Sequence, residues 1–363
     1  MASRVITDDR IKQLNDRDTA EGKYVLYWMQ QSQRALCNHA LEFAIQRANE
    51  LELRLLVAFG LTDDYPDANL RHYAFMLQGL QETQRALRQR KIPLAVQLGE
   101  PAEVACELAA DAAEVVCDRG YLRHQRQWRR QVADEAKCLV WQVESDAAVP
   151  LETVSEKQEY AARTIRPKVN KKLDDYLQPL ATTPLDKASL NLGVGGVSLD
   201  PLDRLLDQLS IDGSVGPVDG FVGGTSQAKS RLKGFLEQHL SSYDERADIN
   251  DPHVSRLSPY LHFGQISPIT IGLEVKGSQG HTTEQKEAFL EELIVRRELA
   301  FNFVYYAKHY DSLKCLPDWA AKTLEKHESD EREHRYTSTE LEDAATHDPA
   351  WNAAMLEMKH RGY

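Results

Sequence analysis

Short apolar segments alternate with helical patterns in the first 150 residues, and this alternation constrains the fold more than any other feature. The apolar segments cover 24–29, 53–59, 93–98, 113–117 and 138–143, and stretches with helical spacing cover 33–51, 70–90, 101–110 and 123–136. Strands that are apolar throughout are buried on both faces, and parallel strands need a helix to connect them. We therefore predict an α/β domain with a doubly wound parallel sheet at about residues 20–150.

The second half of the chain has a different character. Residues 151–224 are first polar and basic and then rich in Pro, Gly, Ser and Asp, which predicts a linker or a long surface excursion. The glycines at 193–196 and 220–224 do not match a phosphate-binding loop, so we interpret them as a flexible connection. From 225 to 363 the pattern is helical, which predicts an all-α C-terminal domain.

Composition excludes several classes of protein. The chain has 363 residues, of which 42% are hydrophobic and 28% are charged, a mixture typical of a globular protein and not of a disordered one. No apolar run reaches the roughly 18 residues of a membrane span, and the N-terminus lacks a secretory signal, so we expect a cytoplasmic protein. The five cysteines and twelve histidines follow no metal-binding spacing, so we expect no metal site and no disulfide framework.

Two Ser-Pro pairs predict two helix starts within ten residues. Ser258-Pro259 and Ser267-Pro268 each combine an N-cap residue with proline at the first helical position. A helix start presents free N–H groups that suit a phosphate or a pyrophosphate. Two well-capped helices without a ligand are the simpler interpretation, and the pattern alone favours it.

Residues 284–308 predict one long helix. Its expected buried stripe consists of Phe289, Leu293, Ala300, Phe303, Val304 and Ala307. Glu292 and Arg296 are four residues apart, the favourable order for an ion pair. The pair is either a solvated one of small energetic value or a carboxylate and a guanidinium side by side in a pocket.

These motifs together resemble one known family, the class II cyclobutane pyrimidine dimer photolyases. The resemblance covers about residues 24–363 in the family's order, and the stretches 255–264 and 289–299 are its most specific part. The matching stretches are WMQQSQR (28–34) with Asn38, EYAARTIRPK (159–168), SRLSPYLHFG (255–264), FLEELIVRREL (289–299), HYDSLK (309–314) and HDPAWNAA (347–354).

The resemblance implies a fold, a cofactor and a reaction. The family joins an α/β antenna domain by a long linker to a helical domain that holds FAD, with a possible second antenna chromophore. It implies light-driven electron transfer from reduced FAD to a pyrimidine dimer that has been flipped out of UV-damaged DNA. The residues that fall where the family contacts FAD are Tyr243, Leu257, Ser258, Pro259 and Leu261.

The resemblance also implies substrate and relay residues. Glu292 falls where the family places a carboxyl group against the dimer bases, and Arg296 and Arg297 are the candidates for contacts with DNA. Trp351 falls on the tryptophan chain that photoreduces FAD, with Tyr336 expected beside it. Although the net charge is −12, we expect a basic set to face DNA. This set comprises Arg163, Arg166, Lys168, Lys171, Lys172, Lys229, Arg231, Lys233, Arg296 and Arg297.

Two departures from the family pattern qualify the expectation. The family has arginine before Asn-Asp-Pro, whereas Ile249 precedes 250–252 here, with Arg246 as the possible substitute. The chain also stops at Tyr363, where the resemblance leads us to expect further helices. We therefore expect an incomplete FAD-binding domain over 225–363, missing one wall of its pocket.

Alternative functions follow from this expectation. One is a truncated flavin-binding or DNA-binding remnant without repair activity, and another is a light-sensing flavoprotein. An adenine-nucleotide-binding protein of the universal-stress type would explain only the first half of the chain. For the photolyase interpretation we expect a monomer whose partner is UV-damaged DNA, with no membrane and no metal.

Overall fold

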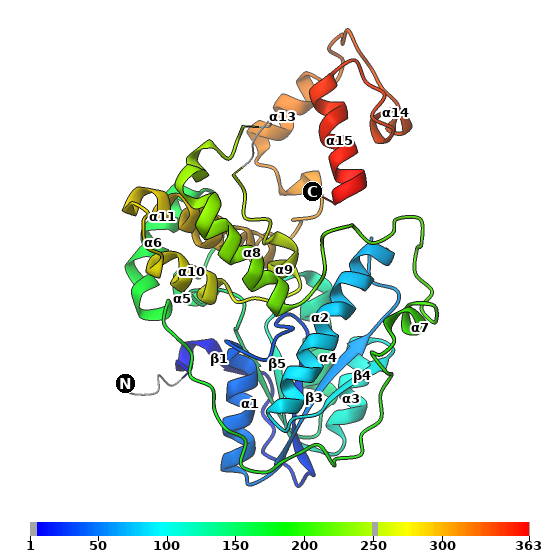
Figure 1. The fold of residues 1–363 in the computed structure, drawn as a ribbon, viewed down its shortest axis with the longest axis vertical. Helices are drawn as coiled ribbons and strands as arrows, with labels where there is room; N and C mark the ends of the chain where they lie inside the picture. The colour runs from blue at the N-terminus through cyan, green and yellow to red at the C-terminus, as the bar shows by residue number, and fades with distance from the viewer. Residues whose placement is uncertain (1–5, 249–252, 363) are drawn as a thin grey trace.

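A mixed sheet of six strands organises the first part of the computed structural model, which describes residues 6–248 and 253–362 (Figure 1). The strand order is β1-β6-β5-β2-β3-β4, and all neighbours are parallel except β1, which pairs antiparallel with β6 at the edge. The strands are β1 (Ile11–Gln13), β2 (Tyr24–Trp28), β3 (Arg54–Leu61), β4 (Leu94–Leu98), β5 (Ala112–Asp118) and β6 (Leu139–Val143).

Helices cover both faces of this sheet, because side chains of successive strand residues point to opposite sides. On β2, Val25 and Tyr27 join the core under α1 (His39–Glu50) and α2 (Leu70–Gln89). Leu26 and Trp28 instead join the opposite core. There they pack with α3 (Pro101–Ala109) and α4 (Arg123–Glu135). The predicted doubly wound α/β fold is confirmed.

Two details of this domain differ from the prediction. β1 was not predicted, because three residues without an apolar pattern give no signal on their own and form a strand only through pairing with β6. The first long helix begins at His39, not at 33, with Asn38 as its N-cap: the Asn38 side chain accepts a hydrogen bond from Leu41 N at 3.0 Å. The residues before it form a loop that serves the contact between the domains.

The predicted linker contains two kinds of structure. Its first part forms α5 (Leu151–Val154) and α6 (Ala162–Tyr176), which pack into the core of the helical domain. The chain then crosses the surface of the α/β domain, with the short α7 (Leu202–Leu206) on the way (Figure 1). Gly213 lies in open space, but a Cβ at Gly223 would overlap Phe75 O of α2. Within 220–224, Gly223 therefore allows the chain to pack closely against α2, and this segment is not only a flexible connection.

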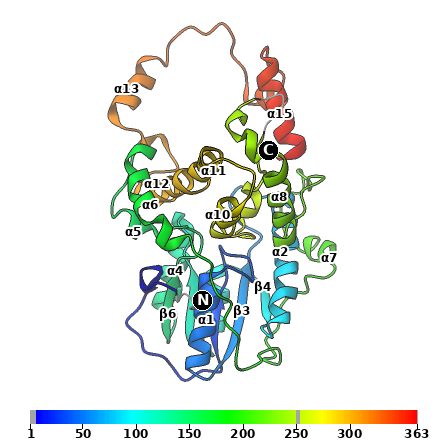
Figure 2. The ribbon, with the colours of Figure 1, turned by 60° about the vertical axis from the view of Figure 1, so that its left-hand side comes forward.

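The helical domain surrounds a second core (Figure 2). Its elements in chain order are α8 (Thr225–Gln238), the 3₁₀ turn η2 (Leu240–Glu245), α9 (Ser258–His262), α10 (Pro268–Gly277), α11 (Thr283–Leu290), the π-helix η3 (Glu291–Arg296) and α12 (Arg297–Tyr306). The predicted helix over 284–308 is thus continuous but contains a π segment. Within the described part of the chain, no helix is long and apolar enough to span a membrane.

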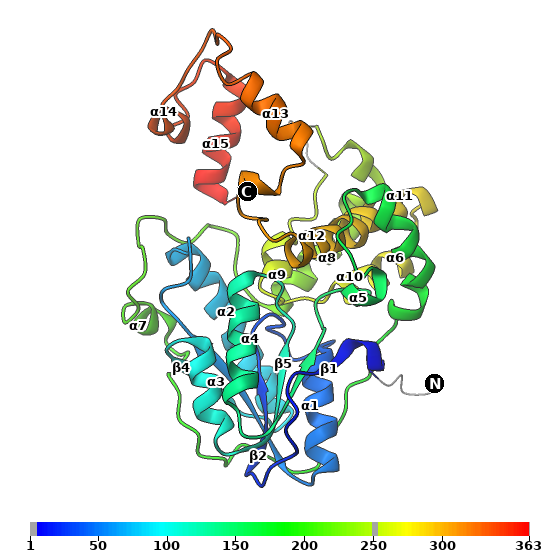
Figure 3. The ribbon, with the colours of Figure 1, turned by 180° about the vertical axis from the view of Figure 1, so that it is seen from behind.

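The last segment packs loosely on the rest, as Figures 2 and 3 show. It holds η4 (Leu313–Cys315), α13 (Asp318–Lys326), α14 (Ser338–Glu342) and α15 (Pro349–Arg361), and none of the described residues in these elements is buried. Leu313 and Trp319 are 75% and 73% exposed, respectively. The apolar side chains of this segment therefore contribute little to the core.

Candidate functional site

A pocket of about 380 Å³ lies between the two domains. This volume falls within the range of small-molecule sites, roughly 300–1,000 Å³. One wall is α2 of the α/β domain, the second is the linker at 217–221, and the third is α9, with the end of α15 at the rim. The side chains from α9 and the residue after it are Ser258, Pro259, His262 and Phe263.

The structure corrects the predicted capping at one of the two Ser-Pro pairs. Ser267 caps α10 as predicted, since its side chain accepts a hydrogen bond from Ile269 N at 3.2 Å. α9, however, has Leu257 at its N-cap without a side-chain cap, and Ser258 is already its first helical residue. The reason is that Leu257 has αR backbone angles, which start the turn one residue earlier. Ser258 thus lines the pocket from inside the helix.

The predicted cofactor residues fall into two groups. Ser258 and Pro259 line the pocket. Tyr243 is buried and packs its ring edgewise on Phe289, with centroids 5.1 Å apart, and Leu257 and Leu261 belong to the same core. The structure therefore brings two of the five to the cavity and places the other three in the helical core.

The pocket walls suit a nucleotide. Arg71 and Arg361 provide positive charge, and no carboxylate occurs among the described residues that line the pocket. Phe75 is 8% exposed and Phe263 lies 5.7 Å from it, centroid to centroid, so that apolar rings adjoin the polar groups. Cationic donors beside aromatic faces can bind a phosphate and a flat ring together. These residues suit the phosphate groups and one flat ring of a larger cofactor such as FAD.

The predicted ion pair between Glu292 and Arg296 is wrong. Arg296 Nε instead donates to Glu291 Oε1 at 3.3 Å, and Glu292 Oε1 accepts from Arg246 Nη2 at 3.2 Å. The cause is the π-helix η3, because its i→i+5 pattern brings residues five apart onto one face, whereas an α-helix aligns residues four apart.

Arg166 completes this cluster of charges. Its guanidinium forms two parallel hydrogen bonds to Glu291, at 2.9 and 2.6 Å, so that Glu291 is shared by two arginines. These two guanidinium groups keep the pKa of Glu291 below its ordinary value, with the Arg166 hydrogen bond as the largest cause. Glu292 is half-exposed beside the pair, at 38% of its side chain. π-segments of this kind are frequent at functional sites.

The structure places Arg297 away from the exposed surface that Arg296 occupies. Its side chain is 17% exposed, against 52% for Arg296. The guanidinium donates to Asp146 O at 2.6 Å and to the Asp146 carboxylate at 3.2 Å. It also stacks over Phe301, 4.4 Å from the ring centre. Arg297 thus ties α12 to the end of the α/β domain, and its contact with DNA stays a prediction.

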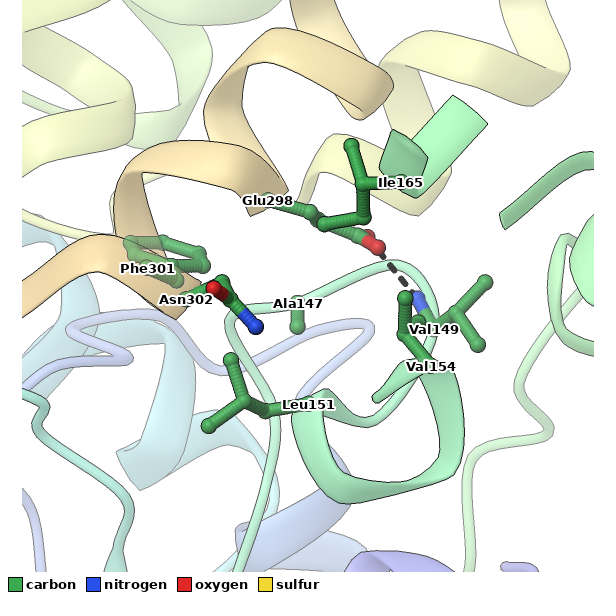
Figure 4. Close-up of a pocket in the computed structure, with 8 residues that line it drawn as sticks. All are labelled: Ala147, Val149, Leu151, Val154, Ile165, Glu298, Phe301 and Asn302. Atoms are coloured by element: carbon green, nitrogen blue, oxygen red, sulfur yellow. Dashed lines mark hydrogen bonds between the residues drawn. The ribbon is translucent and has the colours of Figure 1, made fainter. Parts of the chain in front are cut away.

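Its neighbour Glu298 is a buried carboxyl group at the same interface. Glu298 Oε1 accepts a hydrogen bond from Val149 N at 2.9 Å, and Oε2 has no partner among the described residues (Figure 4). The side chains around it leave no room for a water molecule. Burial raises the pKa of Glu298 to about 8, against the lowering effects of Val149 and Arg297. The group is therefore mostly protonated at neutral pH.

Arg34 joins the two domains, although the sequence indicates it only as part of a motif. It is 1% exposed and donates to Gly264 O at 2.9 Å, to Ser145 O at 3.0 Å and to Cys37 O at 3.0 Å. Since Gly264 lies two residues after the end of α9 in the helical domain, one guanidinium connects the end of the sheet with the pocket wall.

Asp118 at the carboxyl end of β5 shapes the loop that carries Arg34. Its Oδ2 accepts three backbone N–H bonds, from Gln30, Gln31 and Ser32, at 2.9 to 3.0 Å. Burial nevertheless raises its pKa, the largest of the causes at this site. The sequence could have indicated the role of Asp118, because a single aspartate follows an apolar strand there. Polar residues at the ends of parallel strands gather at one edge of the sheet.

Trp351 lies on α15 and is 44% exposed. The expected neighbour, Tyr336, hydrogen-bonds through its hydroxyl to His347 Nδ1 at 2.5 Å and stacks with that ring. His347 stacks in turn on His334, with centroids 3.7 Å apart. The structure thus groups Tyr336 with two histidines.

Ion pairs neutralise part of the predicted basic set. Lys168 contacts Glu159 at 2.5 Å, and Lys233 lies 3.8 Å from Glu237.

Of the departures from the family pattern, 249–252 lie outside the described residues, while Arg246 contacts Glu292 as described above. Within the described part of the chain, no group of three or more His, Cys, Asp and Glu side chains is arranged to hold a metal.

Comparison with known proteins identifies the class of this fold. The bacterial class III photolyase from Agrobacterium tumefaciens superposes with a TM-score of 0.71 at 17% identity, over 95% of this chain and 70% of that one. The fold is therefore that of a photolyase. In sequence, residues 25–185 match the DNA photolyase family.

Curated relatives extend the match over nearly the whole chain. The deoxyribodipyrimidine photo-lyase of Methanothermobacter thermautotrophicus is 44% identical over 99% of this chain and 80% of its own length. The deoxyribodipyrimidine photo-lyase of Arabidopsis thaliana is 37% identical over 93% and 70%. The chain belongs to the DNA photolyase family. This confirms the resemblance to photolyases that the motifs indicate and the fold class that the strand and helix pattern predicts.

Proposed function

We propose that this protein is a deoxyribodipyrimidine photo-lyase of the class II type, which uses light to split cyclobutane pyrimidine dimers in DNA. One observation carries the proposal: the 44% identity to a protein of that name continues through 99% of the chain. It therefore includes the α9 and η3 regions, whose geometry supports the roles proposed below. The class II assignment rests on the quoted motifs.

FAD, when bound, supplies the light-driven electron for dimer cleavage. Ser258 and Pro259 would contact the cofactor from the pocket wall. Tyr243, Leu257 and Leu261 would support it from the core to which they belong. A second antenna chromophore, also proposed, would bind separately and transfer excitation energy. Trp351 would relay electrons for photoreduction, and its partial exposure is consistent with the outer end of such a relay.

Glu292 would contact the bases of the flipped dimer. Arg246 holds its carboxylate at 3.2 Å, which limits the positions that the side chain adopts. Arg296, the more exposed of the two neighbouring arginines, would contact a DNA phosphate. In this proposal the protein acts as a monomer in the cytoplasm, where all five of its cysteines stay free, as they are in the structure.

The test is repair of an oligonucleotide that contains one cyclobutane dimer, under blue light and in the dark. The full chain loaded with FAD should restore the absorbance of the pyrimidines only in the light. Glu292→Gln should lower the yield per absorbed photon several-fold, whereas Glu287→Gln, on the exposed face of α11, should leave it unchanged. A FAD-loaded protein without light-dependent repair would contradict the proposal.

A further inference from the structure

The pocket beside α9 is shared by both domains. α2 belongs to the α/β domain, and its first two turns supply Arg71, His72 and Phe75 to the cavity opposite Ser258 and Phe263. A ligand held by α9 would therefore meet side chains of the α/β domain directly.

The backbone at the start of α2 is already engaged. Leu70 N donates to Asp212 O at 2.8 Å, and Arg71 N donates to Val215 O at 3.2 Å. These bonds fix the linker whose next residues, Pro217 and Val218, form the pocket wall. Binding of an anion at this end of α2 therefore depends on side chains and not on free amides.

Arg71 keeps donors and charge available. Its Nε, Nη1 and Nη2 donate to Gly216 O, Met358 O and Lys359 O, at 3.1, 3.2 and 2.8 Å. A guanidinium carries five N–H bonds, so two remain. Its hydrogen-bond acceptors here are neutral carbonyls, which orient the group without cancelling its charge.

His72 adds a neutral donor. Its Nδ1 accepts a hydrogen bond from Asn69 N, the N-cap residue of α2, at 3.1 Å. Burial lowers the pKa of His72, with the Arg71 charge as a second cause, so the ring is neutral near pH 7. With Nδ1 as acceptor, Nε2 carries the proton and donates.

We infer that Arg71 and His72 of the α/β domain bind the phosphate groups of the dinucleotide cofactor in the pocket that Ser258 and Pro259 line. The inference rests on the proposed function, because it shares those two residues with the proposed FAD site. It extends that site across the domain boundary: the helical domain supplies one wall and α2 supplies the cation and the N–H donor.

Release of FAD from the full chain on dilution, followed by flavin fluorescence, tests the inference. Arg71→Gln should release FAD at least tenfold faster. For the unsubstituted protein, release should accelerate with salt, and this dependence should weaken in Arg71→Gln because one phosphate contact is gone. Arg71→Lys, which keeps the charge, should restore part of the salt dependence.

His72→Asn provides a second variant. Asparagine keeps an acceptor where Nδ1 lies and thus preserves the cap of α2, but it lacks the donor at Nε2. It should release FAD several-fold faster with unchanged thermal stability. Arg88→Gln, on the exposed far end of the same helix, is the matched control and should behave like the unsubstituted protein.

The outcomes separate this inference from the proposed function. Release at the unsubstituted rate from Arg71→Gln overturns the inference, even if repair is normal. Faster release with an unchanged salt dependence also overturns it, since Arg71 would then only position α15 and the linker. A protein that holds FAD through Arg71 but repairs no dimer contradicts the proposed function and leaves the inference intact. A chain that retains no FAD overturns both.

Discussion

Gly264 occupies a position where no other residue fits. Its φ is +63°, and a Cβ there would overlap the carbonyl oxygen of Gln31 in the α/β domain. Its own carbonyl accepts from Arg34. The close approach of two backbones therefore requires the absence of a side chain.

Gly264→Ala should destabilise the protein, because the new methyl group forces the domains apart and the residue is strained at positive φ. We expect a loss of about 2–4 kcal/mol in the free energy of unfolding, measured in urea. Gly213→Ala, in open space and without a positive φ, is the control and should change stability by less than about 0.5 kcal/mol. Equal stability of the two variants would refute the packing argument.

Glu298 makes stability depend on pH. Its pKa is about 8 in the folded protein and near 4.5 when exposed. Below pH 4.5 the carboxyl group is protonated in both states. Between pH 4.5 and 8 only the unfolded chain loses the proton, so folding stability decreases across this window by an amount on the order of a few kcal/mol.

Glu298→Gln should remove this dependence, since an amide accepts the Val149 hydrogen bond without ionising. The stability of the variant relative to the original protein should therefore increase from pH 4.5 to 8, as measured by denaturant unfolding at several pH values. A difference between the two proteins that stays constant with pH would show that Glu298 does not titrate in this range.

At the scale of elements, the π-helix η3 decides which side chains share a face. The sequence predicts a buried stripe at Ala300, Phe303 and Val304, but Ala300 is exposed and Glu298 and Asn302 are buried instead. One wider turn rotates everything after it relative to an ideal helix. Side-chain periodicity cannot reveal that rotation, because it assumes 3.6 residues per turn throughout.

Glu291 of this element neutralises two arginines, Arg166 of α6 and Arg296 of η3 itself. Glu291→Gln should release Arg166 and Arg296 for phosphate contacts, so binding of dimer-containing DNA should tighten several-fold and depend more steeply on salt. Arg296→Ala should act in the opposite direction and reduce the salt slope by about one. Equilibrium binding at four salt concentrations measures both, and parallel slopes for the three proteins would contradict the assignment.

Elements with strong local patterns were predictable. All five apolar strands and the helices at 70–90, 101–110 and 123–136 lie within two residues of their observed bounds. The start of α1 could not be predicted, because Asp118 at the end of a distant strand organises the loop before this helix. The same holds for the site: motifs identified Ser258 and Glu292 and offered Arg246 as a substitute for the family's arginine. Arg71 and His72 enter only through tertiary contacts between segments remote in sequence.

At the scale of the whole molecule, buried polar groups hold the two domains together. Arg34, Arg297 and Glu298 all contact backbone or side chains of the other domain or of the chain leading to it. Buried donors and acceptors are costly when a partner is lost, so this interface should come apart as a unit.

Arg34→Met should uncouple the domains, because it keeps the bulk of the side chain and leaves the carbonyl groups of Gly264 and Ser145 without their donor. We expect a loss of about 3–5 kcal/mol and two separate calorimetric transitions instead of one. Arg17→Met, at an exposed position, is the control. A single transition in the Arg34 variant with an unchanged midpoint would be the contrary result.

The bond between Arg34 and Gly264 spans 230 residues of sequence. A ribosome that adds roughly 5–20 residues per second needs about 10–50 s to cover this distance. The last strand, β6, ends at Val143, so in the later part of that interval the sheet is complete, but the guanidinium beside it has no partner from the helical domain. The nascent α/β domain should therefore expose its future interface, and conditions that slow translation should increase its dependence on chaperones.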